Sequence, residues 1–97
     1  MKIYWILYLP IVMAFHPLQL IRYKIDRIDD AIYELLRVRM KYAKKTTKFK
    51  TTVQSTEREQ SILNRLKSKD GLEKEFVEEI WQPIFNYSRV IQAVKSE

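Results

Sequence analysis

The 97-residue chain holds no cysteine and a single histidine, which excludes a disulfide framework, a thiolate metal site and a metal site with several histidines. One glycine and three prolines are too few for a sheet protein with many turns, so we expect a single all-α domain. The formal net charge of +6 favours an anionic partner, such as nucleic acid, a membrane surface or a small polyanion. A domain this short buries only about 60–65% of its unfolded surface, which favours an oligomer.

Residues 1–17 are predicted to be a hydrophobic N-terminal extension of a domain at residues 18–97. The apolar run in this extension is shorter than the roughly 20 residues that a helix needs to span a bilayer, so no stable membrane insertion is expected. Three interpretations of the extension stay open: a true translation start at Met13, a segment that packs on the domain, or a signal peptide in residues 1–14. The protein is expected in the cytoplasm. If residues 1–14 are a signal peptide, it is expected to be exported.

A long helix is predicted over about residues 18–50. Seam residues step alternately by four and three for more than three heptads, as in a coiled coil. They are Ile21, Ile25, Ile28, Ile32, Leu35, Arg39, Tyr42 and Thr46. A helix of this length cannot bury its seam against two short helices of its own chain. The seam therefore predicts that a second copy of the chain packs against this helix, that is, a homodimer.

Two further helices are predicted after a short turn. Thr56-Glu57-Arg58-Glu59 fits a capping box with Thr56 as the N-cap, and Gly71 is suited to end the short helix that follows. A helix of medium length is predicted over about residues 73–94, where Pro83 should cause a kink. The apolar stripe of this last helix consists of Phe76, Ile80, Ile84, Tyr87 and Ile91.

Polar side chains at apolar positions mark the candidate binding site. Arg39 interrupts the seam, and a buried arginine needs an anion, either a ligand or an acid such as Glu34 or one from the partner chain. Lys50 follows eleven residues later, about 20° around the helix axis and roughly 16 Å along it, so the two cations can bracket a small dianion. Arg22 lies roughly 25 Å from Arg39 along the same helix, so only the partner's Arg22 in an antiparallel dimer can reach the same ligand.

The two shorter helices carry further polar candidates. Glu59 lies on the apolar face of the second helix, as a ligand-binding carboxylate or as the acid of the capping box. Ser88 and Gln92 lie one turn apart on the third helix, beside its apolar stripe.

In chain order these segments resemble the AroQ-type, all-helical chorismate mutases over about residues 18–93. The resemblance is carried by Ile21-Arg22-Tyr23-Lys24-Ile25-Asp26-Arg27-Ile28-Asp29, Leu35-Leu36-Arg37-Val38-Arg39, Lys50, Arg58-Glu59 and Ser88-Arg89-Val90-Ile91-Gln92. It implies an all-α fold of three helices, one long, one short and one medium, interleaved in an intertwined homodimer. It also implies an isomerase that converts chorismate to prephenate for phenylalanine and tyrosine biosynthesis, without a cofactor or a metal.

The resemblance further implies a role for each matching residue. Arg39 and the partner's Arg22 would bind the substrate carboxylates, and Lys50 and Gln92 would bind the ether oxygen. Glu59 would bind the ring hydroxyl. The residues expected to support the carboxylate side are Arg58 and Ser88.

The chain departs from the family pattern at four places. The hydrophobic residues 1–17 have no counterpart in the cytoplasmic members. Ser55 stands where the family has an aspartate three residues before the Arg-Glu pair, so Ser55 joins the substrate-binding candidates with an open role. The segment between Lys50 and Arg58 is about a turn shorter than in the bacterial type member. Pro83 is unexpected, and a kink there would shift Ser88 and Gln92.

Three other functions stay open at this point. An isochorismate-pyruvate lyase uses the same scaffold and similar cations, and the choice of substrate separates it from a mutase. A non-enzymatic basic helical adaptor or nucleic-acid binder would bind with strong salt dependence. That class does not explain why Arg39 interrupts the seam, so no nucleic acid is expected as a partner. The third is a degenerate mutase without turnover.

Overall fold

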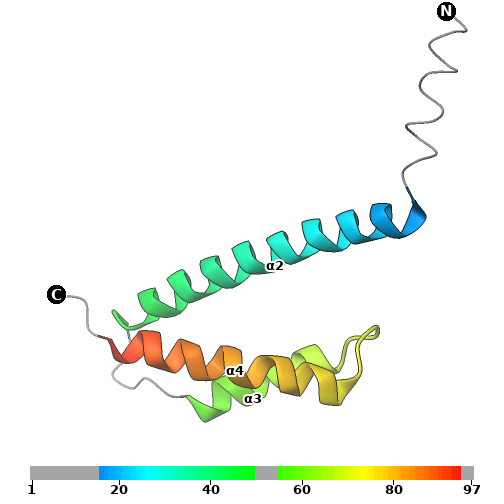
Figure 1. Cartoon of the computed structure of the whole chain (residues 1–97). Helices are drawn as coiled ribbons and strands as arrows, with labels where there is room; N and C mark the ends of the chain where they lie inside the picture. The colour runs from blue at the N-terminus through cyan, green and yellow to red at the C-terminus, as the bar shows by residue number, and fades with distance from the viewer. Residues whose placement is uncertain (1–15, 50–54, 95–97) are drawn as a thin grey trace, which may run out of the picture. The chain divides into compact units, whose positions relative to one another are not determined.

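The computed structural model describes residues 16–49 and 55–94, which form three α-helices and no strand. They are α2 (Pro17–Thr46), α3 (Thr56–Lys67) and α4 (Lys74–Ala93), as Figure 1 shows. The predicted all-α fold with one long, one short and one medium helix is confirmed for this part of the chain. Residues 1–15 lie outside the described ranges, so the interpretations of the N-terminal extension stay predictions.

The chain divides into two compact units, residues 1–36 and 37–97. The described part of the first unit is the N-terminal portion of α2, and the second unit holds the last turns of α2 together with α3 and α4. No helix of the described ranges is both long enough and apolar enough to cross a membrane.

The N-terminal portion of α2 has no buried side chain. The helix begins with Pro17, whose missing N–H costs nothing at the first helical position, and His16 Nδ1 accepts a hydrogen bond of 3.1 Å from the Leu18 amide. The predicted seam residues from Ile21 to Leu35 are 49–69% exposed. The apolar face that these residues form is thus exposed to solvent in a single chain.

The C-terminal end of α2 comes earlier than predicted. The helix ends at Thr46 and not at residue 50, and the amides of residues 47–49 bond to carbonyls three residues back. The Thr46 and Thr47 hydroxyls donate to the Ala43 and Lys44 carbonyls at 2.6 and 2.7 Å, so they compete with the backbone for the acceptors that a longer helix would use. Lys50 lies outside the described residues, and its place on the face of Arg39 stays a prediction.

The N-terminal cap of α3 is Ser55, one residue before the predicted Thr56. Ser55 Oγ accepts a hydrogen bond of 3.2 Å from the Arg58 amide. Because the residue three positions after Ser55 is an arginine, the predicted capping box is wrong: a serine caps the helix alone. The cap places Arg58 and Glu59 in the first turn of α3.

Replacing Ser55 by alanine is therefore expected to destabilise the protein by about 1 kcal/mol, as the loss of an N-cap usually does. In a domain of this size the midpoint of thermal unfolding should fall by about 4–8 °C. Ser55→Asp should restore the midpoint, since aspartate is an equally good cap. Thr56→Ala is the matched control, and a larger loss in that variant than in Ser55→Ala would return the cap to Thr56.

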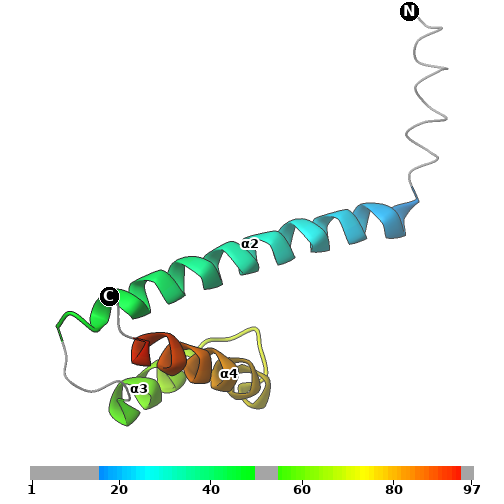
Figure 2. The same ribbon diagram turned by 60° about the vertical axis from the view of Figure 1, so that its left-hand side comes forward.

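Helices α3 and α4 lie side by side and antiparallel in both views of Figures 1 and 2. Gly71, in the connection between them, has φ +123°, a conformation that only glycine adopts without strain. The core between the two helices consists of Ile62, Leu63 and Phe85, with Leu66 and Trp81 packed against it. A Lys67–Glu78 ion pair joins the same two helices near the turn.

The buried face of α4 differs from the predicted apolar stripe. Val77, Phe85 and Ser88 are buried, whereas Phe76, Ile80 and Tyr87 of the stripe are 40–57% exposed. The same helical spacing, shifted by one residue from the predicted stripe, gives residues 77, 81, 85, 88 and 92. These carry both apolar and polar side chains. The helix continues through Pro83, so Ser88 and Gln92 stay on one continuous α4.

Candidate active site

A pocket of about 250 Å³ lies within the second unit, between the last turns of α2, the first turns of α3 and the C-terminal half of α4. Three guanidinium groups and one carboxylate line it, together with several neutral side chains. The lining residues are Arg39, Tyr42, Ala43, Thr46, Ser55, Arg58, Glu59, Ile62, Phe85, Ser88, Arg89 and Gln92. Since cations outnumber anions, the pocket is suited to a small anion.

Arg39 is held by contacts from α4. Its Nη1 donates a hydrogen bond of 2.8 Å to Ser88 Oγ, and its guanidinium carbon lies 5.8 Å from the centre of the Phe85 ring. Ser88 is only 7% exposed, so the Arg39 side chain reaches into the packed interface of the unit. The bond to Ser88 uses one of five N–H donors of the guanidinium.

Burial lowers the pKa of Arg39, and the neighbouring positive charge of Arg58 lowers it further, while Glu59 raises it. Two like charges held together in a partly desolvated site repel each other, and an anionic ligand relieves that repulsion. Arg39 stood out in the sequence because it interrupts the apolar seam, and in the structure it lines this pocket.

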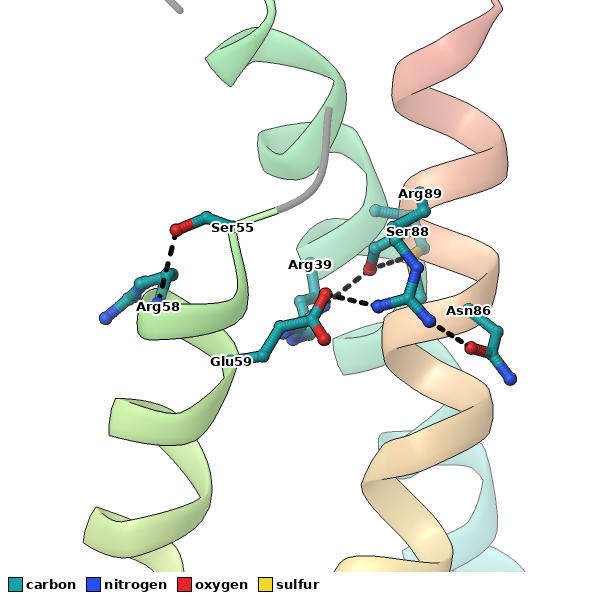
Figure 3. A network of polar contacts seen from close by, with 8 residues as sticks. Arg39, Ser55, Arg58, Glu59, Asn86, Ser88 and Arg89 are labelled. Atoms are coloured by element: carbon teal, nitrogen blue, oxygen red, sulfur yellow. Dashed lines mark hydrogen bonds and ion pairs between the residues drawn. The ribbon is translucent and has the colours of Figure 1, made fainter. Parts of the chain in front are cut away.

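Glu59 points from α3 toward α4, as Figure 3 shows. Its carboxylate accepts a hydrogen bond from Arg89 Nη1 in an ion pair, and Arg89 Nη2 donates to Asn86 Oδ1. Arg89 is a pocket residue that the sequence analysis missed, since it was named only as part of the segment Ser88-Arg89-Val90-Ile91-Gln92 and given no role. Its place directly after Ser88 was the only available hint.

Gln92 lies at the α2 side of the pocket. Its Nε2 donates to the Ala43 carbonyl at 3.2 Å and to Thr46 Oγ1 at 3.0 Å. Lys44 Nζ reaches back to the carbonyls of Ile91 and Val94 at the end of α4. The last turns of α2 and of α4 are thus tied together on both sides.

Six predicted site residues line this one pocket: Arg39, Ser55, Arg58, Glu59, Ser88 and Gln92. Arg22 lies in the first unit, with an exposed side chain on α2, and Lys50 lies outside the described residues. The roles predicted for these last two stay predictions.

The positive charges and dipoles of the pocket suit a small dicarboxylate that also carries neutral polar groups. Arginine binds carboxylates through two parallel hydrogen bonds, and Ser88 and Gln92 supply neutral polar groups at the pocket wall. Within the described ranges no three histidine or acidic side chains lie together as metal ligands.

Comparison with known proteins agrees with this geometry. The family model described as chorismate mutase type II matches residues 21–93, which include all twelve lining residues of the pocket. No significant match was found among curated proteins or solved structures. The chain belongs to the type II chorismate mutase family, as its sequence predicted.

Proposed function

We propose that this protein is a chorismate mutase that converts chorismate to prephenate in phenylalanine and tyrosine biosynthesis. The observation that carries the proposal is that six residues predicted from widely separated segments line one cationic pocket inside the family match. Chorismate carries two carboxylates, a ring hydroxyl and an ether oxygen. The pocket offers a chemical partner for each of these groups.

The reaction is a rearrangement within one molecule. The bond between the ether oxygen and the ring breaks while a carbon–carbon bond forms, and no proton or electron enters or leaves. The task of the protein is therefore to hold the extended side chain of the substrate over its ring. Donors aimed at the ether oxygen then stabilise the negative charge that builds on it in the transition state.

The carboxylates are assigned to arginines. Arg39 binds one carboxylate together with Arg22 of the partner subunit, and Arg58 and Ser88 support this side of the pocket. The Ser88 hydroxyl does so by holding the Arg39 guanidinium in place. Ser55 acts through its cap, which sets the position of Arg58 at the start of α3.

The ether oxygen and the ring hydroxyl are assigned to three further residues. Lys50 and Gln92 donate to the ether oxygen, and Glu59 accepts from the hydroxyl. The Gln92 amide already donates to two acceptors at the end of α2, so one of these bonds must open when the substrate binds.

The test is the loss of chorismate absorbance with purified protein, with prephenate identified as the product. Saturable turnover to prephenate supports the proposal. A parallel assay with isochorismate separates the two activities of the scaffold: release of pyruvate from isochorismate, without formation of prephenate from chorismate, would make the protein a lyase.

We also propose that the protein acts as a homodimer through the apolar face of α2. Five large apolar side chains on this face are exposed in one chain, and Arg22 directly follows the first of them, Ile21, in the sequence. Covering these side chains with a second copy removes apolar surface from water. It also allows Arg22 of the partner subunit to complete the pocket.

Replacing Ile28 by glutamate, at the middle of this face, is expected to convert the dimer to monomer and to abolish activity, because a buried unpaired carboxylate is very costly. Sedimentation velocity at fixed protein concentration measures the state of association. Tyr33→Glu is the matched control, since Tyr33 is exposed and lies about 140° around the helix from Ile28. An active Ile28→Glu dimer would place the interface elsewhere.

A further inference from the structure

We propose that Arg89 is a positioning residue: it pairs with the Glu59 carboxylate and so leaves the Arg39 and Arg58 guanidiniums available to the carboxylates of the substrate. This inference rests on the proposed function and adds a residue to which the resemblance assigns no role.

The geometry of Arg89 fits a clamp on Glu59. One end of its guanidinium donates to Glu59 on α3, and the other end donates to Asn86, one turn earlier on α4. The side chains of the pair are only 26% and 22% exposed, so water screens their attraction less than it screens a surface ion pair. Figure 3 shows the Glu59 carboxylate turned toward α4.

Arg39 and Arg58 line the same pocket as Glu59. The charge of Arg58 lowers the pKa of Arg39 and the charge of Glu59 raises it, so the three charges influence one another. A partly buried carboxylate that loses its partner turns to the next cation, since an unpaired charge in such a site is costly. Glu59 would then compete with the substrate.

Two consecutive residues of α4 thus each hold one charged group of the pocket. Ser88 holds Arg39 by a hydrogen bond of 2.8 Å, and Arg89 holds Glu59 by an ion pair. With Glu59 neutralised by Arg89, Arg39 and Arg58 present two positive charges to a dianionic ligand. With Glu59 paired to Arg39, only Arg58 would remain.

The test is a double-mutant cycle of Arg89→Met and Glu59→Gln, measured by steady-state turnover of chorismate with the full chain. Arg89→Met should raise KM about tenfold and lower kcat much less, because the substrate must first displace Glu59 from the pocket arginines. In the Glu59→Gln background the same change should shift KM by less than about twofold, since the neutral amide competes weakly. Arg89→Lys should recover most of the loss.

Arg65→Met is the matched control, because it removes the same charge from an exposed position outside the pocket. An equal rise in KM in both Glu59 backgrounds would overturn the proposal and make Arg89 a direct ligand of the substrate. A lower midpoint of thermal unfolding with unchanged KM would leave Arg89 a structural role only.

Failure of the proposed function looks different from failure of this inference. A wild-type chain that binds chorismate without turnover refutes the mutase proposal. The same cycle, measured as the Kd for chorismate by titration calorimetry, then still decides the role of Arg89 by the same criterion.

Discussion

Replacing Arg39 by alanine is expected to lower kcat for chorismate by about two orders of magnitude or more, which is the usual cost of losing one preorganised charged donor. Arg39 donates to the buried Ser88, contacts the Phe85 ring and faces the pocket. Alanine removes the charge that orients the substrate and leaves Arg58, Arg89 and Glu59 as the charged side chains of the pocket. Steady-state kinetics with prephenate detection measures the loss.

Two further variants test whether the effect depends on the position of the lost charge and on the shape of the side chain that carries it. Lys41→Ala removes a positive charge two residues further along α2 from an exposed side chain, and its kcat should match that of the wild type. Arg39→Lys keeps the charge but not the planar fork that binds a carboxylate through two bonds, so it should recover only part of the activity. Turnover of the Arg39→Ala variant at the wild-type rate would remove Arg39 from the catalytic site.

Replacing Phe85 by alanine is expected to destabilise the protein by about 3–5 kcal/mol, the usual cost of truncating a buried phenylalanine. Phe85 is 2% exposed and is the most buried residue of the α3–α4 core. Domains of this size are stable by only about 5–15 kcal/mol, so the variant should lose a large part of its free energy of unfolding. Urea unfolding at one protein concentration measures the change, because the stability of the proposed dimer would depend on concentration.

Phe49→Ala is the matched control for this second prediction. The same atoms are removed from a side chain that is 88% exposed, and the free energy of unfolding should change by no more than about 0.5 kcal/mol. Equal losses in the two variants would mean that the core lies elsewhere than between α3 and α4.

The three helices could be predicted from the sequence because each has a strong helical period, and the short helix also has a capping hydroxyl and a glycine near its ends. Where the predictions differ from the structure, the cause is local competition. The hydroxyls of Thr46 and Thr47 take the carbonyls that a longer α2 would need. The Ser55 hydroxyl accepts the hydrogen bond of the Arg58 amide, so Ser55 and not Thr56 is the N-cap.

The site was predictable where a residue broke a pattern. Arg39 stood out because an arginine at a seam position demands a partner. Arg89 broke no pattern, since an arginine on a helix flank is ordinary, and its partner Glu59 lies 30 residues away in the chain. Its function depends on the way α3 and α4 pack.

The sequence by itself determined the helical class, the three segments, the family and the unusual place of Arg39, because periodicity and the spacing of polar residues act within one helix. The tertiary structure decided which face of α4 is buried and which charges pair across helices. Burial depends on the neighbour that a face meets, and Val77, Phe85 and Ser88 meet one while Phe76, Ile80 and Tyr87 do not within a single chain. Opposite charges attract by distance in space, and only the packing of α3 on α4 brings Glu59 to Arg89.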